Sequence, residues 1–236
     1  IIKEKTPNLV FGSLAHCLIL QPEEFEKEFI VQPVLDRRTK AGKEEFAEFE
    51  LKAAGKTIIT EDQLEKAMMM KNHLLDNYAA KTLLSEGTSE KSVIWQKEIG
   101  GVPCKAKLDK IRNGLLIDYK TTSDITEDSL LLSIAKFGYH RQMAWYMEAA
   151  EIELGKRPEA AILIFQDKEF PQMISVRNLS EDALAQGRKE CDEAYLGICE
   201  RLESGNWDAY PQKIEEINLP AWYFKKHQED IEYDVN

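Results

Sequence analysis

Two aspartates and two lysines lie at matching positions on either side of a predicted hairpin turn. The dipeptide Asn113-Gly114 separates two runs of alternating apolar residues, a pattern typical of a two-residue turn between antiparallel strands. Counting outward from this turn places Asp109 opposite Asp118, and Lys107 opposite Lys120. Directly opposed carboxylates repel each other, and a divalent cation bound by their oxygens offsets that repulsion. The hairpin therefore favours a metal site.

An ordinary solvated sheet face is the alternative interpretation of the same hairpin. Side chains alternate along a strand, so Asp118 and Lys120 share one face while Ile117 and Tyr119 point to the other. A solvated face would more naturally pair aspartate with lysine than like with like. The hairpin by itself leaves both interpretations open.

A lysine two residues beyond a metal-binding carboxylate suits phosphodiester hydrolysis. A metal ion polarises the phosphate and lowers the pKa of a bound water. The Lys120 ammonium could orient that water and stabilise the charge that develops on the phosphate. A second two-residue turn is expected at Gly100-Gly101, and its register brings Glu98 onto the same face as Lys105 and Lys107.

The elements that must position these residues follow from periodicity and capping signals. Thr60, followed by Gln63, predicts a capping box at the start of a helix. The predicted helices cover residues 12–20, 44–54, 62–78, 79–84, 127–153 and 180–202. The predicted strands cover residues 93–99, 102–111, 115–121, 160–165 and 172–176. This order indicates an α/β fold whose central sheet contains an antiparallel meander flanked by helices.

Composition limits the class of protein. The net charge of −11 counts modestly against a nucleic-acid binder, although a locally basic channel can still hold DNA. The four cysteines lie far apart and suggest neither a disulfide framework nor a metal site, so reduced cytoplasmic thiols are expected. No apolar run is long enough to span a bilayer, so no membrane association is expected.

Four short motifs resemble those of one nuclease superfamily. Asp109, followed by Asp118-Tyr119-Lys120, resembles the PD-(D/E)xK signature, with Leu108 in the place of the proline. Three further segments resemble the G-x-x-x-H, D-Y-K-T and Q-x-x-x-Y motifs of its RecB-like branch, in the branch's order; they are Gly12–His16, Asp118–Thr121 and Gln142–Tyr146.

Longer segments are most similar to the RecE group, the nuclease domain of exonuclease VIII and its phage relatives. These segments are G-S-L-A-H-C-L-I-L-Q-P-E-E-F from Gly12 and D-R-R-T-K-A-G-K from Asp36. The resemblance covers about Leu9 to Trp222 and implies a PD-(D/E)xK nuclease-like core. A single nuclease domain is therefore expected over residues 1–224, followed by a mobile acidic tail over 225–236.

The resemblance also implies roles for individual residues. It assigns metal binding to His16, Asp109, Asp118 and the backbone carbonyl of Tyr119, and it assigns the attacking water to Lys120. It suggests that Glu98 binds or positions a second ion. The residues expected to contact DNA, with Gln142 and Tyr146 also able to support the metal site, are Gln142, Tyr146, Arg37, Arg38, Lys40, Lys105 and Lys107.

The function implied by the resemblance is 5′-to-3′ degradation of linear double-stranded DNA, leaving 3′ single-stranded tails for recombination by strand annealing. Two Mg²⁺ ions per site are expected, with Mn²⁺ as a substitute. The protein is expected to form a ring-shaped homotetramer and to work with a single-strand annealing protein. Its expected location is the cytoplasm of a bacterium or phage-infected cell. Two alternatives remain at this point: a RecB-like nuclease of other polarity or single-strand preference, and a catalytically silent DNA-binding module.

Overall fold

The computed structural model describes residues 6–207 and 213–224 of the chain. Two compact units divide the chain, Ile1–Gly197 and Ile198–Asn236. The predicted acidic tail, 225–236, lies outside the described residues, and the predicted domain boundary at residue 224 stays a prediction. In the described ranges, no helix combines the length and the apolar character needed to cross a membrane.

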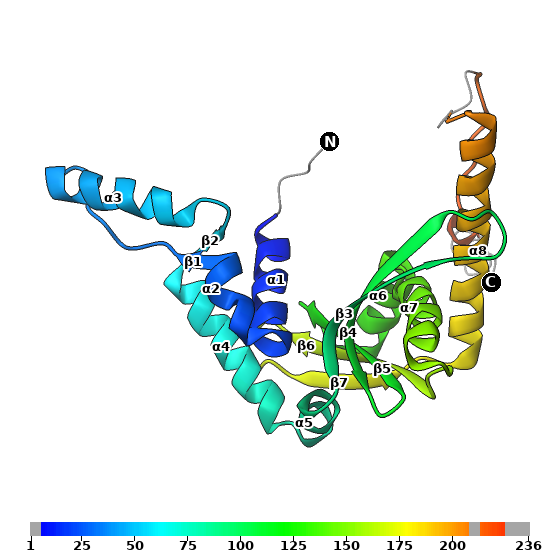
Figure 1. Cartoon of the computed structure of the whole chain (residues 1–236), viewed down its shortest axis with the longest axis horizontal. Coiled ribbons are helices and arrows are strands. Elements are labelled where there is room, and N and C mark those ends of the chain that lie inside the picture. Colours follow the sequence, from blue (N-terminus) through cyan, green and yellow to red (C-terminus); the bar gives the residue numbers. More distant parts are fainter. Residues whose placement is uncertain (1–5, 208–212, 225–236) are drawn as a thin grey trace, which may run out of the picture. The chain divides into compact units, whose positions relative to one another are not determined.

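A five-stranded sheet, in the order β3-β4-β5-β6-β7, carries the predicted hairpin (Figure 1). The pairs β3–β4, β4–β5 and β6–β7 are antiparallel, whereas β5 and β6 are parallel. The prediction of a central mixed sheet with an antiparallel meander is therefore confirmed. The strands are β3 (Thr88–Gln96), β4 (Pro103–Arg112), β5 (Leu115–Thr122), β6 (Ala160–Asp167) and β7 (Ile174–Asn178).

The turn between β4 and β5 has the conformation that its two residues favour. Asn113 and Gly114 have φ angles of 48° and 77°, in the left-handed region that a type I′ turn requires. Arg112 pairs with Leu115 and Lys110 with Ile117, as counting from the turn predicts. The local sequence is therefore sufficient to set this register.

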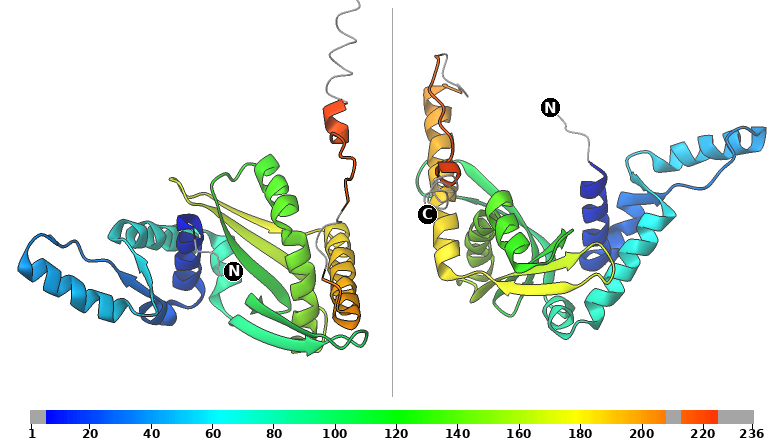
Figure 2. Two further views of the ribbon diagram at one scale, coloured as in Figure 1. Left: turned by 90° about the horizontal axis from the view of Figure 1, so that it is seen from above. Right: turned by 180° about the vertical axis from the view of Figure 1, so that it is seen from behind.

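Helices cover both faces of the sheet. α7 (Tyr139–Leu154) packs across β3, β4 and β5, and α5 (Tyr78–Ser85) contacts β4 and β7. Figures 1 and 2 show these two helices on opposite faces of the sheet. On the face of α5, Ile117 and Tyr119 pack with Leu74 and Ala80. The remaining long helices are α1 (Pro7–Leu20), α3 (Lys40–Ala53), α4 (Glu61–Asp76), α6 (Glu127–Phe137) and α8 (Glu181–Ser204).

The helical stretch predicted over residues 127–153 consists of two helices, because the structure divides it at Gly138 into α6 and α7. Gly138 has a φ of 68°, and its amide donates to the carbonyl groups of Ile134 and Ala135. A left-handed residue that closes the last turn in this way ends a helix, and glycine adopts that conformation without a Cβ clash.

The register predicted for the β3–β4 hairpin is also wrong. Gln96 pairs with Pro103, so residues 97–102 form a longer loop in place of a two-residue turn at Gly100-Gly101. The Tyr195 hydroxyl of α8 holds this loop by donating to the Ile99 carbonyl at 2.9 Å and accepting from the Val102 amide at 3.1 Å. A tertiary contact thus overrides the turn preference of the glycine pair.

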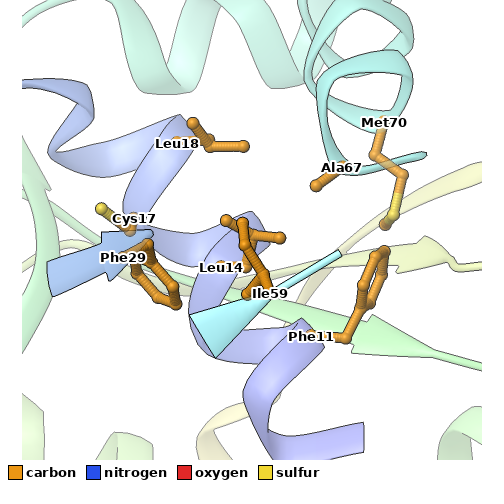
Figure 3. Packing of buried hydrophobic residues seen from close by; sticks show 8 residues of the cluster. All are labelled: Phe11, Leu14, Cys17, Leu18, Phe29, Ile59, Ala67 and Met70. Atoms are coloured by element: carbon orange, nitrogen blue, oxygen red, sulfur yellow. The ribbon is translucent and has the colours of Figure 1, made fainter. Parts of the chain in front are cut away.

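A second hydrophobic cluster packs α1 against α4 and a small sheet. Figure 3 shows Phe11, Leu14, Cys17 and Leu18 of α1 packing with residues of α4 and of a two-stranded parallel sheet. The strands of this small sheet were not predicted, because each spans only three residues; they are β1 (Phe29–Val31) and β2 (Thr57–Ile59). A short 3-10 helix (Pro22–Glu24) and α2 (Phe25–Glu28) precede them. The capping box at Thr60 and Gln63 is confirmed at the start of α4.

Gln166 of β6 links α4 to β5 inside the core. It is fully buried, accepts a hydrogen bond from the Tyr119 hydroxyl at 2.8 Å and donates one to the Met70 carbonyl at 2.8 Å. Substitution Gln166→Leu leaves both partners buried and unpaired, so we expect the free energy of unfolding to fall by about 2 kcal/mol or more. Chemical denaturation measures this change. The matched variant Gln186→Leu, on the exposed surface of α8, is expected to change stability by less than about 0.5 kcal/mol, and an equal loss in both variants would contradict the prediction.

Candidate active site

The two aspartates of the hairpin lie at the point where β4 and β5 separate. The ladder between these strands ends at Lys110 and Ile117, one residue before Asp109 and Asp118. There, the Tyr119 amide donates to Asp109 Oδ2 at 3.0 Å, which replaces the backbone partner that a continued ladder would supply. The carboxylate of Asp109 is thereby held where β4 and β5 separate, within reach of His16 of α1.

Asp118 is fully buried, and two polar groups reach its carboxylate. Gln142 Nε2 of α7 donates to Asp118 Oδ1 at 3.1 Å, and Lys120 Nζ lies 2.6 Å from Asp118 Oδ2. Burial and the nearby Asp109 charge raise the pKa of Asp118 to about 7. Keeping Asp118 charged in this buried position therefore costs free energy, which a bound cation would offset.

His16 of α1 lies between two carboxylates. Its Nε2 is 2.7 Å from Asp109 Oδ2, and its Nδ1 is 3.0 Å from Glu90 Oε1. Although burial by itself disfavours the charged ring, hydrogen bonds to Asp109 and Glu90 raise the pKa of His16 to about 10. Without a metal ion, the imidazolium therefore supplies positive charge between these carboxylates, and a cation bound by a nitrogen of His16 would take the place of one of its protons.

Lys120 carries its positive charge in a largely buried position. Burial by itself would lower the pKa of Lys120, but the carboxylates of Asp118 and Asp109 raise it above its ordinary value. Its Nζ also lies 5.1 Å from the centre of the Tyr139 ring. The ammonium form is therefore the stable one, and it suits charge stabilisation better than proton abstraction.

The donor set at this site fits a divalent cation. Among the described residues, ligand atoms of His16, Glu90 and Asp109 all lie within 4.8 Å of one another. The buried Oδ2 of Asp118 meets no well-aligned hydrogen-bond donor in the described chain. Carboxylate oxygens with one imidazole nitrogen form a set that accepts Mg²⁺, Mn²⁺ or a similar ion.

Glu90 joins the site where Glu98 was expected. In the observed register, Glu90 falls opposite Asp109, between the pairs Ser89–Lys110 and Lys91–Leu108. It interrupts the ladder with a φ of 53°, and its carboxylate also forms an ion pair with Lys107. Glu98 lies exposed in the loop 97–102, and it does not line the cleft described below. The alternation of side chains along β3 could have indicated Glu90, if the predicted strand had been extended toward its N-terminal end.

These positions allow a matched comparison of two glutamates. We expect Glu90→Gln to weaken the binding of Mn²⁺ by about tenfold or more, because it removes one anionic ligand from a compact set. Glu98→Gln is expected to leave Mn²⁺ binding unchanged. Isothermal titration calorimetry of both variants measures the difference. Weaker binding in Glu98→Gln alone would restore the role first assigned to Glu98.

His16, Glu90 and Lys120 of this site line a cleft of about 1170 Å³, whereas the buried Asp109 and Asp118 do not line it. The residues that line it come chiefly from α1 and α6, its two walls, and from the C-terminal ends of β5 and β6, its floor. Four lysines line it, which makes the cleft more basic than the chain as a whole; they are Lys107, Lys120, Lys136 and Lys168. Serine and threonine hydroxyls line it as well, at Ser13, Thr121, Thr122, Ser123, Ser129 and Ser133.

The residues expected to contact DNA are not all gathered here. Of the two β4 lysines that were expected to contact DNA, Lys107 lines the cleft, whereas Lys105 is exposed outside it. Gln142 is hydrogen bonded to Asp118 and to Tyr146, so its amide is already committed to the carboxylate site.

The predicted basic cluster precedes and begins α3, outside the cleft lining. The Arg37 guanidinium lies 3.7 Å from the centre of the Phe46 ring, and Lys40 pairs with Glu44 at 3.8 Å. The Arg38 side chain is exposed. A role of this cluster in binding DNA stays a prediction.

Comparisons with known proteins place the chain in a family and support its fold. The model of a family described as "PDDEXK-like domain of unknown function (DUF3799)" matches residues 2–220. No curated protein matches the chain. Among solved structures, a protein from Eubacterium rectale named "Putative exonuclease" is similar with a TM-score of 0.59 and 14% sequence identity, over 95% of this chain and 81% of that one. A protein named SSO0001 aligns at 13% identity over 91% of this chain and 90% of its own, with a TM-score of 0.32. At these identities, the E. rectale structure supports the fold alone.

Proposed function

The chain belongs to the family of PDDEXK-like domains, and from this membership we propose that it is a metal-dependent nuclease that hydrolyses phosphodiester bonds of DNA. One observation carries the proposal. Asp109, Asp118, Glu90 and His16 converge with the Lys120 ammonium beside a cleft that is lined by lysines and by serine and threonine residues. Clustered carboxylates supply metal ligands, and the lysines of the cleft suit the phosphates of a polynucleotide.

The residues that would hold the metal are His16, Glu90, Asp109 and Asp118, with the backbone carbonyl of Tyr119. When bound, the ion would polarise the phosphate and lower the pKa of water. Lys120 would stabilise the negative charge that develops on the phosphate and would orient the attacking water. Gln142 holds the Asp118 carboxylate in place through Oδ1, which leaves Oδ2 directed to Lys120.

The finer form of the proposal is a Mg²⁺-dependent exonuclease that degrades linear double-stranded DNA from 5′ ends. The RecE-like motifs around His16, Asp118 and Gln142 support this form. The same proposal includes a ring-shaped homotetramer, two Mg²⁺ ions per site, a single-strand annealing protein as partner and a cytoplasmic location.

Release of nucleotides from linear duplex DNA tests the function. We expect Mg²⁺-dependent release that stops with EDTA, proceeds from the 5′ end of an end-labelled duplex and spares covalently closed circular DNA. Comparison of 5′-phosphate and 5′-hydroxyl ends examines how the end is recognised. Release from 3′ ends, or from single strands alone, would favour a RecB-like nuclease of other specificity. Absence of cleavage of every DNA, with Mg²⁺ or Mn²⁺, would leave a catalytically silent binding module.

A further inference from the structure

A row of aromatic rings lines the cleft and leads from an exposed phenylalanine toward Lys120. The ring centres of Phe137 and Tyr139 are 5.7 Å apart, and those of Tyr139 and Phe165 are 6.1 Å apart. Lys120 Nζ lies 5.1 Å from the Tyr139 ring centre. The left-handed turn at Gly138 lets Phe137, the last residue of α6, meet Tyr139, the first residue of α7. The row therefore extends from an exposed apolar side chain to the Lys120 ammonium.

Phe137 is the exposed end of this row. Its side chain is 60% exposed although it lines the cleft, and Leu132, on the same wall of α6, is 70% exposed. Tyr139 is half-buried and Phe165 is buried, so exposure falls along the row toward Lys120. Exposed apolar groups in a cleft that is otherwise polar indicate a ligand with an apolar surface of its own.

The remainder of the cleft suits the charged part of the same ligand. Lys136 and Ser133 lie on α6 within one turn of Phe137, and both line the cleft. On the floor, Lys168 is hydrogen bonded to Asn8 of α1 at 3.3 Å, and this pair lines the cleft as well. Ammonium and hydroxyl groups bind phosphates, while an aromatic ring beside them offers a stacking surface for a base.

We infer that Phe137 stacks on an unpaired base of the DNA strand that enters the cleft, next to the nucleotide whose phosphate reaches Lys120. The position of that phosphate rests on the proposed nuclease function. A base inside a duplex is covered on both faces by its neighbours, so it has no free face for Phe137. The strand in the cleft is therefore single, either from single-stranded DNA or from a duplex end whose terminal base pairs have opened.

Binding of a short labelled oligonucleotide tests this inference without cleavage. The binding experiment uses Lys120→Ala as the parent, and it compares an intact single strand with one that carries abasic sites. We expect Phe137→Ala to weaken binding of the intact strand by about tenfold and to leave binding of the abasic strand unchanged. Phe137→Trp should restore tight binding, whereas Phe137→Leu should bind like the alanine variant. Leu131→Ala, at a 59% exposed position of α6 outside the cleft lining, is the matched control and should bind like the parent.

Three outcomes would overturn the inference: equal affinity of the parent and Phe137→Ala for the intact strand, equal losses on the intact and abasic strands, or no binding of single-stranded DNA by the parent. Nucleotide release by chains with Lys120 intact separates the two proposals. If no DNA is cleaved but the Phe137 variants bind as expected, the nuclease proposal fails and base stacking stands. If DNA is cleaved and the Phe137 variants bind and cleave like the wild type, the stacking inference alone fails.

Discussion

Replacing Lys120 with alanine is expected to lower the rate of metal-dependent DNA cleavage by about 10²- to 10³-fold. The reason is geometric, since Lys120 Nζ lies 2.6 Å from Asp118 Oδ2 and lines the bottom of the cleft. Its ammonium is largely buried, where charge stabilisation is stronger than in water. Initial rates of nucleotide release from linear duplex DNA, at equal concentrations of folded protein, measure the effect.

The Lys120 experiment has a control for charge and one for folding. Lys91→Ala removes a lysine of β3 that pairs with Glu153 and does not line the cleft, so its rate should match the wild type. Removing Lys120 deprives buried Asp118 of its cation, so thermal unfolding of the variant sets the temperature at which rates are compared. A rate within a factor of three of the wild type, in a folded variant, would exclude Lys120 from the chemistry.

The second large effect concerns the metal and Asp118. Mg²⁺ or Mn²⁺ that binds the folded chain alone stabilises it, by about 2.7 kcal/mol at a concentration 100 times the dissociation constant. For a chain of this size, that corresponds to a rise in Tm of about 5–10 °C. Asp118→Asn keeps the size of the side chain but removes the buried anionic ligand, so we expect it to abolish most of this rise.

The matched control for Asp118 is Glu28→Gln. Glu28 lines the same cleft but lies outside the group formed by His16, Glu90 and Asp109. We expect the Glu28 variant to keep the full metal-dependent rise in Tm, measured by thermal denaturation with and without EDTA. If both variants keep the rise, the metal is bound elsewhere. If both lose it, the effect is a general one of negative charge in the cleft.

Those parts of the fold that depend on neighbouring residues were predictable from the sequence. Asn113-Gly114 favours one turn type, and the register from Arg112 to Lys110 follows from it. Thr60 and Gln63 form the predicted capping box, because both hydrogen bonds span only three residues. Alternation along β5 likewise separates Asp118 from Tyr119, which packs in the core on the opposite face.

Contacts between distant segments decided what the sequence alone did not reveal. The loop 97–102 takes its length from Tyr195 of α8, which holds Ile99 and Val102, and that loop sets the register of β3. Glu90 therefore lies opposite Asp109, where a two-residue turn at Gly100-Gly101 would have placed Ser92, because the pairing of β3 with β4 depends on a helix almost 100 residues away.

The hairpin, the acidic pair with its lysine, and the α/β class of the fold could be inferred from the amino-acid sequence alone. Each of these follows from interactions over a few residues, whose energies do not depend on the rest of the chain. The packing of distant segments brings His16 and Glu90 together at Asp109, and it makes α1 and α6 line a cleft in which Phe137 stays exposed. Those arrangements depend on how α1 packs on α4 and how Gly138 turns the chain, and the free energy of such packing is shared among residues far apart in sequence.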